Sequence, residues 1–322
     1  MNIFQSVQFK KAKTFFENTI NIWSVLLLVL VFYLGNDAFL NRFNAKNLLT
    51  NMAPLLVMAT GATFVGLIGS VDLSMGAVCS VANVILVELL PTMGWKAYLV
   101  AAAFGILAGF LLGMVQIKTK IPSFIASLGF MRMWESVALL ITASPVPIAS
   151  ELKGFIAWGK TSFGIISLMT ILALISALLF FFFQRFNRVG RSISVIGGNE
   201  RAAWLSGIEV DKYKLIAFMI SGFTAALCGI MLAVKLKSSA PTVGEPYTLL
   251  AVAAVLLGGT SGASGKGNIL KTISGVLIVT IIQNGMTIIG VDAFWNQIVF
   301  GGLIVVAMML NVERGTKNLV VK

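Results

Sequence analysis

The feature that most constrains this chain is a series of long apolar runs separated by short polar connectors. Residues 165–183 and 215–234 contain no charged side chain, and each run is about as long as the 20 residues that a helix needs to cross a bilayer. Hydrophobic residues make up 58% of the 322-residue sequence and charged residues only 11%, which is far more apolar than a water-soluble domain. We therefore expect an all-α protein that crosses a membrane many times.

The apolar runs predict about ten spans, some of them short or broken, in a single transmembrane domain over residues 1–322. They lie near residues 20–35, 50–69, 74–90, 97–116, 123–142, 163–183, 214–234, 247–258, 269–289 and 294–310. The run at 247–258 is too short for one regular span, so we expect a short helix followed by irregular backbone. Gly105, Gly109 and Gly113 form two overlapping small-xxx-small steps, which predict close packing against a neighbouring helix.

The formal net charge of +12 would suggest a nucleic-acid partner in a soluble protein. Here the basic residues fall in the connectors, and placing the N-terminus in the cytoplasm leaves most of the 24 lysines and arginines on that side. An even number of spans then puts both termini in the cytoplasm. The first apolar run resembles a signal peptide, but no small-residue cleavage pattern follows Leu34, so an uncleaved span is expected.

Several chemistries are excluded by residues that the chain lacks. Without histidine it can build neither a Ser-His-Asp triad nor a His-based metal site. Cys79 and Cys228 both lie in apolar runs, so buried packing is expected rather than a disulfide. The glycine-rich stretch 257–267 departs from a phosphate-binding loop, because Thr260 occupies the first glycine position and Gly267 replaces the hydroxyl residue. We expect no cofactor, no metal and no enzymatic activity.

The connector at about 184–214 is the most informative polar segment. Asn199 is a good N-cap, Glu200 suits the positive end of a helix dipole, and Gly207 can adopt the left-handed conformation that ends a helix. Such a short helix cannot span a membrane. It can present residues 202–205 to a partner protein, or it can rest on lipid headgroups.

Asp72 places a carboxylate inside an otherwise apolar stretch that runs from Met52 to Val87. Because an ionised Asp at the bilayer centre costs about 2.5 to 3.5 kcal/mol, we expect Asp72 at an interface, where it caps the helix that begins near Ser74. The interruptions at 69–74 and 258–268 together suggest a cavity.

Four segments, in order along the chain, resemble the permeases of ribose, galactose, xylose and related ATP-binding-cassette (ABC) importers. They are Gly69–Gly76, Ile121–Gly129, Gly197–Ile208 and Leu257–Ser261. Ser70 and Val71 depart from the usual first motif, and Glu135-Ser136 stands where relatives often carry Arg-Gly. Arg132 lies one helical turn before Glu135, so the two can form an ion pair.

The resemblance implies a type II ABC importer-like permease in the bacterial inner membrane, which carries a monosaccharide or a similar polyhydroxylated solute. It also implies a cytoplasmic ATP-binding subunit, a periplasmic or lipid-anchored solute-binding protein, a second permease copy or paralogue, and no nucleic acid. The residues that would couple the permease to the ATP-binding subunit are Gly197, Gly198, Asn199, Glu200, Ala202, Ala203, Ser206 and Gly207. The motif residues with structural roles are Asp72, Ser74, Gly258, Gly259 and Thr260.

A pathway for a neutral, polyhydroxylated solute needs hydrogen-bonding side chains but no fixed charge. The polar side chains within or near spans are Asn51, Thr60, Asn83, Ser127, Gln283 and Asn284. Each of them can equally well bond a neighbouring helix.

Other kinds of membrane protein compete with this interpretation. An ion-coupled secondary transporter of a small polar solute would need titratable groups near the middle of the membrane, and Glu88, Glu135 and Asp72 are the ones available. A membrane-embedded enzyme is disfavoured because no nucleophile-base or metal-ligand cluster appears. A structural scaffold would not need the interrupted spans.

Overall fold

The computed structural model describes residues 21–260, 265, 267–292, 294–295, 298–299, 301–302 and 305, and this part of the chain is predominantly helical. Seven of its helices are long and apolar enough to cross a membrane, which confirms the all-α membrane class. They are α2 (Arg42–Leu67), α3 (Met75–Met93), α4 (Lys96–Thr119), α5 (Ser123–Ile141), α6 (Leu168–Phe186), α9 (Val210–Leu236) and α11 (Ile269–Ile288). Two shorter apolar helices, Asn21–Gly35 and α10 (Glu245–Leu257), complete the predicted spans up to residue 289. The last predicted span, 294–310, lies largely outside the described residues.

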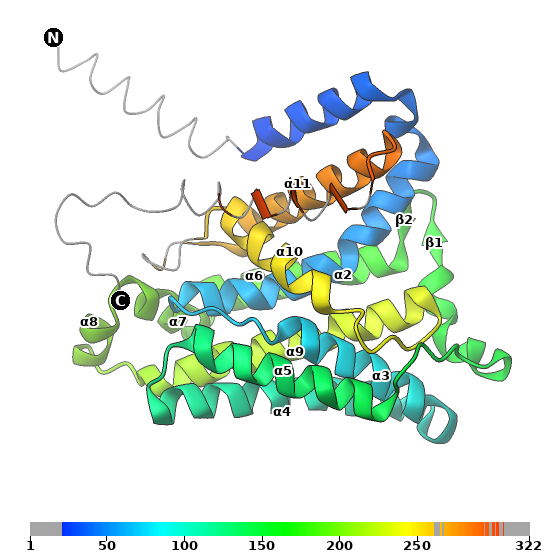
Figure 1. Ribbon diagram of the computed structural model, residues 1–322. Helices are drawn as coiled ribbons and strands as arrows, with labels where there is room; N and C mark the ends of the chain where they lie inside the picture. The colour runs from blue at the N-terminus through cyan, green and yellow to red at the C-terminus, as the bar shows by residue number, and fades with distance from the viewer. Residues whose placement is uncertain are drawn as a thin grey trace, which may run out of the picture.

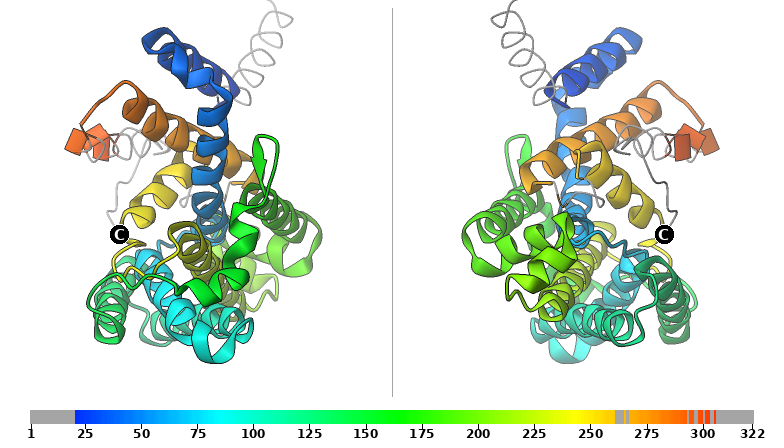
Figure 2. Two further views of the ribbon diagram at one scale, coloured as in Figure 1. Left: turned by 90° about the vertical axis from the view of Figure 1, so that its right-hand side faces the viewer. Right: turned by 90° about the vertical axis from the view of Figure 1, so that its left-hand side faces the viewer.

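The spans run side by side, and the polar elements lie at opposite ends of the bundle (Figure 1). One end carries α7 (Arg188–Gly198) and α8 (Glu200–Leu205). The other carries the helices η1 (Asp37–Leu40) and η2 (Ser150–Lys160) and the short antiparallel pair β1 (Ser162–Phe163) and β2 (Ile166–Ser167). The views along the bundle in Figure 2 place Asn21–Gly35 at its edge.

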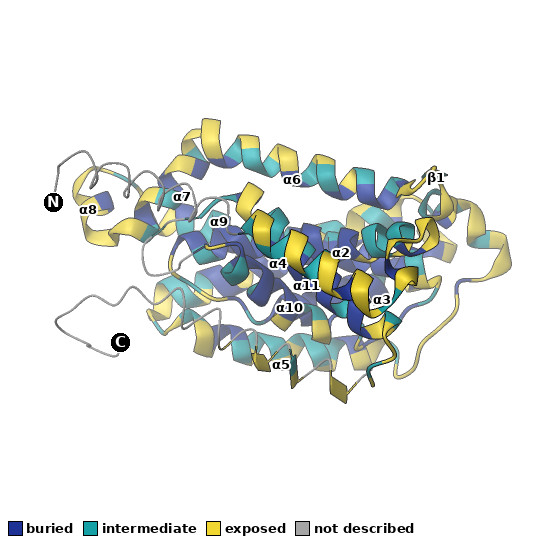
Figure 3. Cartoon of the chain, turned by 90° about the horizontal axis from the view of Figure 1, so that it is seen from above, coloured by how far each residue is buried: buried dark blue, intermediate teal, exposed yellow. Residues whose placement is uncertain are grey.

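Burial separates central helices from peripheral ones. Helices α2, α3 and α9 are mostly buried, whereas α5 and α6 expose apolar faces along the outside of the bundle (Figure 3). An added Cβ at Gly105 would overlap the Gly222 carbonyl, and one at Gly109 would overlap the Phe218 carbonyl, so α4 and α9 pack backbone against backbone. This confirms the close packing predicted from the glycine spacing.

The two predicted interruptions are present. Residues 68–74 between α2 and α3 are not helical, and Gly69 has a φ of 75°, in the left-handed region. Helix α10 ends at Leu257, and Gly259 continues with a φ of 81°. The predicted short helix followed by irregular backbone is therefore confirmed at α10.

The connector at 184–214 holds more structure than the sequence predicted. Helix α7 precedes the predicted short helix, with the Asn187 side chain accepting a hydrogen bond from the Val189 amide at its start. The sequence prediction missed α7, although an asparagine before an amphipathic run is a recognisable helix start.

Candidate functional site

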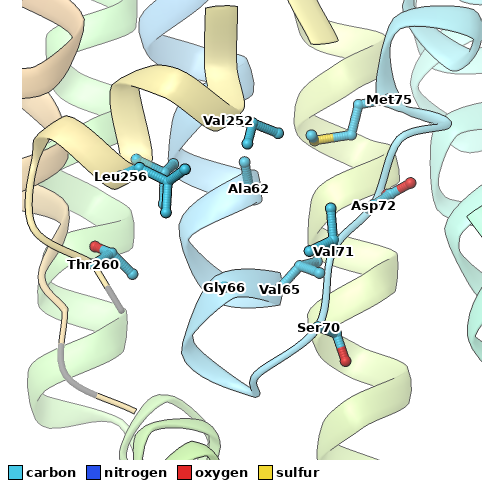
Figure 4. Close-up of a pocket in the computed structure, with 11 residues that line it drawn as sticks. Ala62, Val65, Gly66, Ser70, Val71, Asp72, Met75, Val252, Leu256 and Thr260 are labelled. Atoms are coloured by element: carbon cyan, nitrogen blue, oxygen red, sulfur yellow. The ribbon is translucent and has the colours of Figure 1, made fainter. Parts of the chain in front are cut away.

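A small cavity lies where the two interruptions face each other, between α2, the start of α3 and α10 (Figure 4). Its volume is about 80 Å³. Much of its wall is apolar, formed by Ala62, Val65, Val71, Met75, Val252 and Leu256. Because small-molecule pockets usually measure about 300–1,000 Å³, this volume holds a few waters and no larger solute. We call it the central cavity.

Asp72 borders the central cavity, but its carboxylate points away from it toward α9 (Figure 4). Asp72 is buried, with only 3% of the residue exposed. One carboxylate oxygen accepts the amide of Ser74 at 2.9 Å and its hydroxyl at 2.6 Å, and the other accepts the Ser221 hydroxyl at 2.7 Å. Three donors therefore compensate for the burial of this group.

The prediction that Asp72 caps the following helix is wrong. Helix α3 begins at Met75 with Ser74 as its N-cap, and the Ser74 side chain makes no capping bond because its hydroxyl donates to Asp72. Asp72 therefore fixes the residue before the helix and ties the interruption to Ser221 on α9. The sequence could not reveal this bond, since its partners are 149 positions apart.

The second interruption is shaped by its glycines. A Cβ at Gly258 would meet the carbonyl of Lys271 on α11, and the φ of 81° at Gly259 favours glycine. Thr260 is 1% exposed, and its hydroxyl has no hydrogen-bond partner among the described residues. The motif Gly258-Gly259-Thr260 therefore places a threonine at the edge of the central cavity, with its methyl group toward Gly66.

The short helix predicted in the connector is confirmed as α8. The Asn199 side chain accepts the Ala202 amide at 2.9 Å, and Gly207, with a φ of 78°, ends the helix. Glu200 forms a 2.7 Å ion pair with Lys214 on α9, and the Ser206 hydroxyl donates to the Ala202 carbonyl. Figure 1 shows α8 beyond the ends of the spans.

The exposed surface of α8 differs from the predicted one. Trp204 and Leu205 are 66% and 71% exposed, whereas Ala203 is only 1% exposed. The prediction that Ala203 is available to a partner is wrong, because it faces the rest of the connector. Trp204 and Leu205 form an apolar surface that is large for so short a helix.

The glycine pair before α8 touches both interruptions. A Cβ at Gly197 would overlap the carbonyl oxygen of Leu67, at the end of α2, and would come within 2.8 Å of the Gly265 Cα. A Cβ at Gly265 would in turn meet the amide of Gly198. The end of α7 therefore rests, backbone on backbone, on the two segments that lead to the central cavity.

Three of the polar side chains predicted for a pathway instead form hydrogen bonds inside the bundle. The Thr60 hydroxyl donates to the carbonyls one turn earlier, and the Ser127 hydroxyl donates to the Phe124 carbonyl. Asn83 donates to the Gly229 carbonyl at 3.3 Å and accepts the Ala240 amide at 2.8 Å. All three are buried, and they line neither the central cavity nor the groove described next.

Asn51 and Asn284 come together in a groove at the end of the bundle opposite α8, between the start of α2 and the end of α11. The groove measures about 400 Å³. Further carboxamides line it, from Asn41, Asn44 and Asn47. We call it the asparagine groove. Gln283, which precedes Asn284 in the chain, is half-buried and does not line the groove.

Sequence reasoning missed these three asparagines, although a signal was present. Positions 41, 44, 47 and 51 follow the three- and four-residue spacing of one helix face. Asn44 and Asn284 exchange hydrogen bonds of 2.9 and 2.8 Å, and Lys235 donates to Asn51 at 2.6 Å. The Asn47 side chain makes no hydrogen bond within the described part of the chain.

The predicted ion pair on α5 is confirmed. Arg132 and Glu135 lie 2.9 Å apart, with the arginine side chain largely exposed and the glutamate mostly covered. The pair lines neither the central cavity nor the asparagine groove.

Interrupted apolar spans around a small cavity, with the end of a short connector helix seated on the adjoining segments, are features expected of a membrane permease. The chain belongs to the family described as the permease component of the branched-chain amino acid transport system, which matches residues 44–308. The chain is therefore the membrane subunit of an ABC importer and not an enzyme, since ATP hydrolysis in such importers is the task of a partner subunit.

Curated relatives cover almost the whole chain. The ribose import permease protein RbsC of Bacillus subtilis is 33% identical over 89% of this chain and 90% of its own length. The galactose/methyl galactoside import permease protein MglC of Haemophilus influenzae is 32% identical over 90% and 93%. The probable ABC transporter permease protein YphD of Escherichia coli is 32% identical over 96% and 93%.

Proposed function

We propose that this permease carries a neutral monosaccharide, or a similar polyhydroxylated solute, across the bacterial inner membrane. The observation that most directly supports a transport role is the seat of Gly197 and Gly198 on Leu67 and Gly265. It provides a rigid connection between an exposed helix and the two segments that bound the central cavity. The names of the ribose and galactose permeases support the solute class.

In this proposal α8 is the contact for the cytoplasmic ATP-binding subunit. Trp204 and Leu205 would pack into a groove of that subunit, and Asn199 and Gly207 keep the helix short and fixed at both ends. Movement of α8 would pass through the end of α7 to Leu67 and Gly265. The central cavity must then widen from about 80 Å³ to the several hundred Å³ that a sugar-sized ligand occupies.

The asparagine groove would receive the solute at the opposite end. A carboxamide offers both a donor and an acceptor without a net charge, which suits the hydroxyl groups of a neutral sugar. The orientation that puts α8 and the basic connector in the cytoplasm, together with both termini, places this groove on the periplasmic side. There a periplasmic or lipid-anchored solute-binding protein would deliver the solute, and a second permease copy or paralogue would complete the pathway.

Ion-coupled secondary transport receives less support from the same geometry. Asp72 is bound by three donors and faces away from the central cavity, and Glu135 is paired with Arg132. These two carboxylates are committed to structural contacts, and the third candidate, Glu88, lines neither the central cavity nor the asparagine groove. An ion-coupling site needs a carboxylate that faces the pathway.

The proposal is tested by uptake into proteoliposomes that contain the permease with its ATP-binding subunit and binding protein. We expect uptake of a radiolabelled monosaccharide that requires internal ATP and persists when ion gradients are collapsed. Trp204→Ala should reduce uptake and solute-stimulated ATP hydrolysis together, whereas Leu140→Ala, an 85% exposed leucine on α5, should leave both unchanged. Uptake driven by an ion gradient without ATP would refute the proposal.

A further inference from the structure

A second groove, unrelated to the solute pathway, opens where α6 meets α7 and the start of α11. Its volume is about 350 Å³. The residues that line it are Phe181, Gln184, Arg185, Arg191, Ser194, Val195, Gly267 and Asn268. We call it the arginine groove. No carboxylate lines it, so its two arginines give it a positive charge.

The two guanidinium groups have no acidic partner among the residues that the structure describes. Two acids of the connector are engaged elsewhere, because Glu200 pairs with Lys214 and Glu209 pairs with Lys212, and the third, Asp211, does not line the groove. Unpaired arginines that converge on one groove suit a phosphate group, which a guanidinium can bind with two parallel hydrogen bonds.

The surroundings of the groove select a lipid as the source of the phosphate. Exposed residues run along the outside of α6 (Figure 3), and they include an apolar stripe that extends toward the last turn of the helix, where Arg185 lies. Its members are Leu172, Ile175, Leu178, Leu179 and Phe182. Phe181 and Val195 continue the apolar surface into the groove itself. A free phosphate would gain nothing from this surface, whereas acyl chains would lie along it.

We propose that the arginine groove binds the phosphate headgroup of an anionic phospholipid. One phosphodiester would bridge Arg185 on α6 and Arg191 on α7, at the depth where a span ends and the headgroup layer begins. The remaining polar wall is already fixed, since Gln184 donates to the Gly267 carbonyl at 3.1 Å and accepts the Ile269 amide at 3.2 Å. The groove is therefore built on a rigid support.

The bridge would have a consequence for the connector. Helix α7 ends at Gly197 and Gly198, which rest on the interruptions. A lipid that joins α6 to α7 would therefore fix the angle between these two helices. Anionic lipid would then support the position of α7 without contacting the solute pathway.

The test is lipid retention by the full-length purified permease, measured by native mass spectrometry after titration with phosphatidylglycerol or phosphatidylcholine. We expect preferential retention of phosphatidylglycerol. Each arginine near a membrane surface should contribute about fivefold to the affinity for an anionic lipid, so the double variant Arg185→Gln with Arg191→Gln should weaken retention about 25-fold. Arg201→Gln, an exposed arginine on α8 outside the groove, is the matched control and should bind as the wild type does.

Two further arms make the result decisive. Equal retention of the two lipids by the wild-type protein would overturn the proposal without any variant, as would normal phosphatidylglycerol binding by a double variant whose thermal midpoint is unchanged. Inorganic phosphate at millimolar concentration should not displace the lipid. Displacement would show that the groove takes free phosphate and would overturn its assignment to a lipid.

Discussion

The contact between Gly197 and the end of α2 offers the sharpest test of coupling. In Gly197→Ala the new Cβ would overlap the Leu67 carbonyl oxygen and approach the Gly265 Cα. Both neighbours are backbone atoms, so no side chain can rotate away to make room. The connector must shift instead, while Trp204 and Leu205 on its outer surface stay unchanged.

The magnitude follows from the cost of overpacking a close contact, which is typically about 1–3 kcal/mol. If this cost destabilises the contact between α7 and the end of α2, through which movement reaches the central cavity, transport should fall about 5- to 150-fold. Assembly with the ATP-binding subunit and basal ATP hydrolysis should be retained, because the α8 surface remains intact.

The assay compares solute uptake with ATP hydrolysis in proteoliposomes that contain the complete importer. The matched control is Gly129→Ala on α5, where an added Cβ meets nothing within 4 Å; there the substitution should leave uptake unchanged. Normal uptake per ATP by Gly197→Ala, in a correctly assembled importer, would refute the role given to this contact. Loss of uptake together with loss of assembly would equally contradict it.

Three other substitutions separate structural from solute-binding roles. Asp72→Ala leaves the Ser74 amide and the Ser221 hydroxyl without their buried acceptor. Thermal unfolding should therefore show that the variant loses about 1–3 kcal/mol of stability per unpaired group, a larger loss than for Ser221→Ala. Equal stability of the two variants would contradict this. Asn47→Ala should raise the KM for solute uptake about fivefold, through loss of one hydrogen bond of about 1 kcal/mol, at unchanged thermal stability. Asn83→Ala should do the reverse, because both of its bonds lie inside the protein, and a changed solute preference in this variant would count against its structural role.

What could be predicted from the sequence is what depends on local chemistry. The spans follow from length and hydropathy, and α8 follows from a capping asparagine at 199 and a glycine at 207. The short α10 was predictable because too few apolar residues precede the glycines at 258 and 259. Each of these features is decided within a few turns of the chain.

The side chains that line a pathway depend on how distant helices pack, and there the sequence was less informative. Asn83 and Asn284 are equally polar in the sequence, and both form hydrogen bonds inside the protein, yet only Asn284 also lines the asparagine groove. The asparagine spacing from 41 to 51 was a local signal that would have identified the groove. The bond from Asp72 to Ser221 had no such signal, because two separate spans supply its partners.

The central claim is that movement of the connector opens the central cavity, and cysteine accessibility in that cavity tests it most directly. Val65 lines the cavity and is 1% exposed, so Val65→Cys in the complete importer should react slowly with a water-soluble maleimide at rest. Turnover with ATP and solute should accelerate the labelling, and Gly197→Ala in the same background should abolish the acceleration. A labelling rate that ATP does not change would contradict the account.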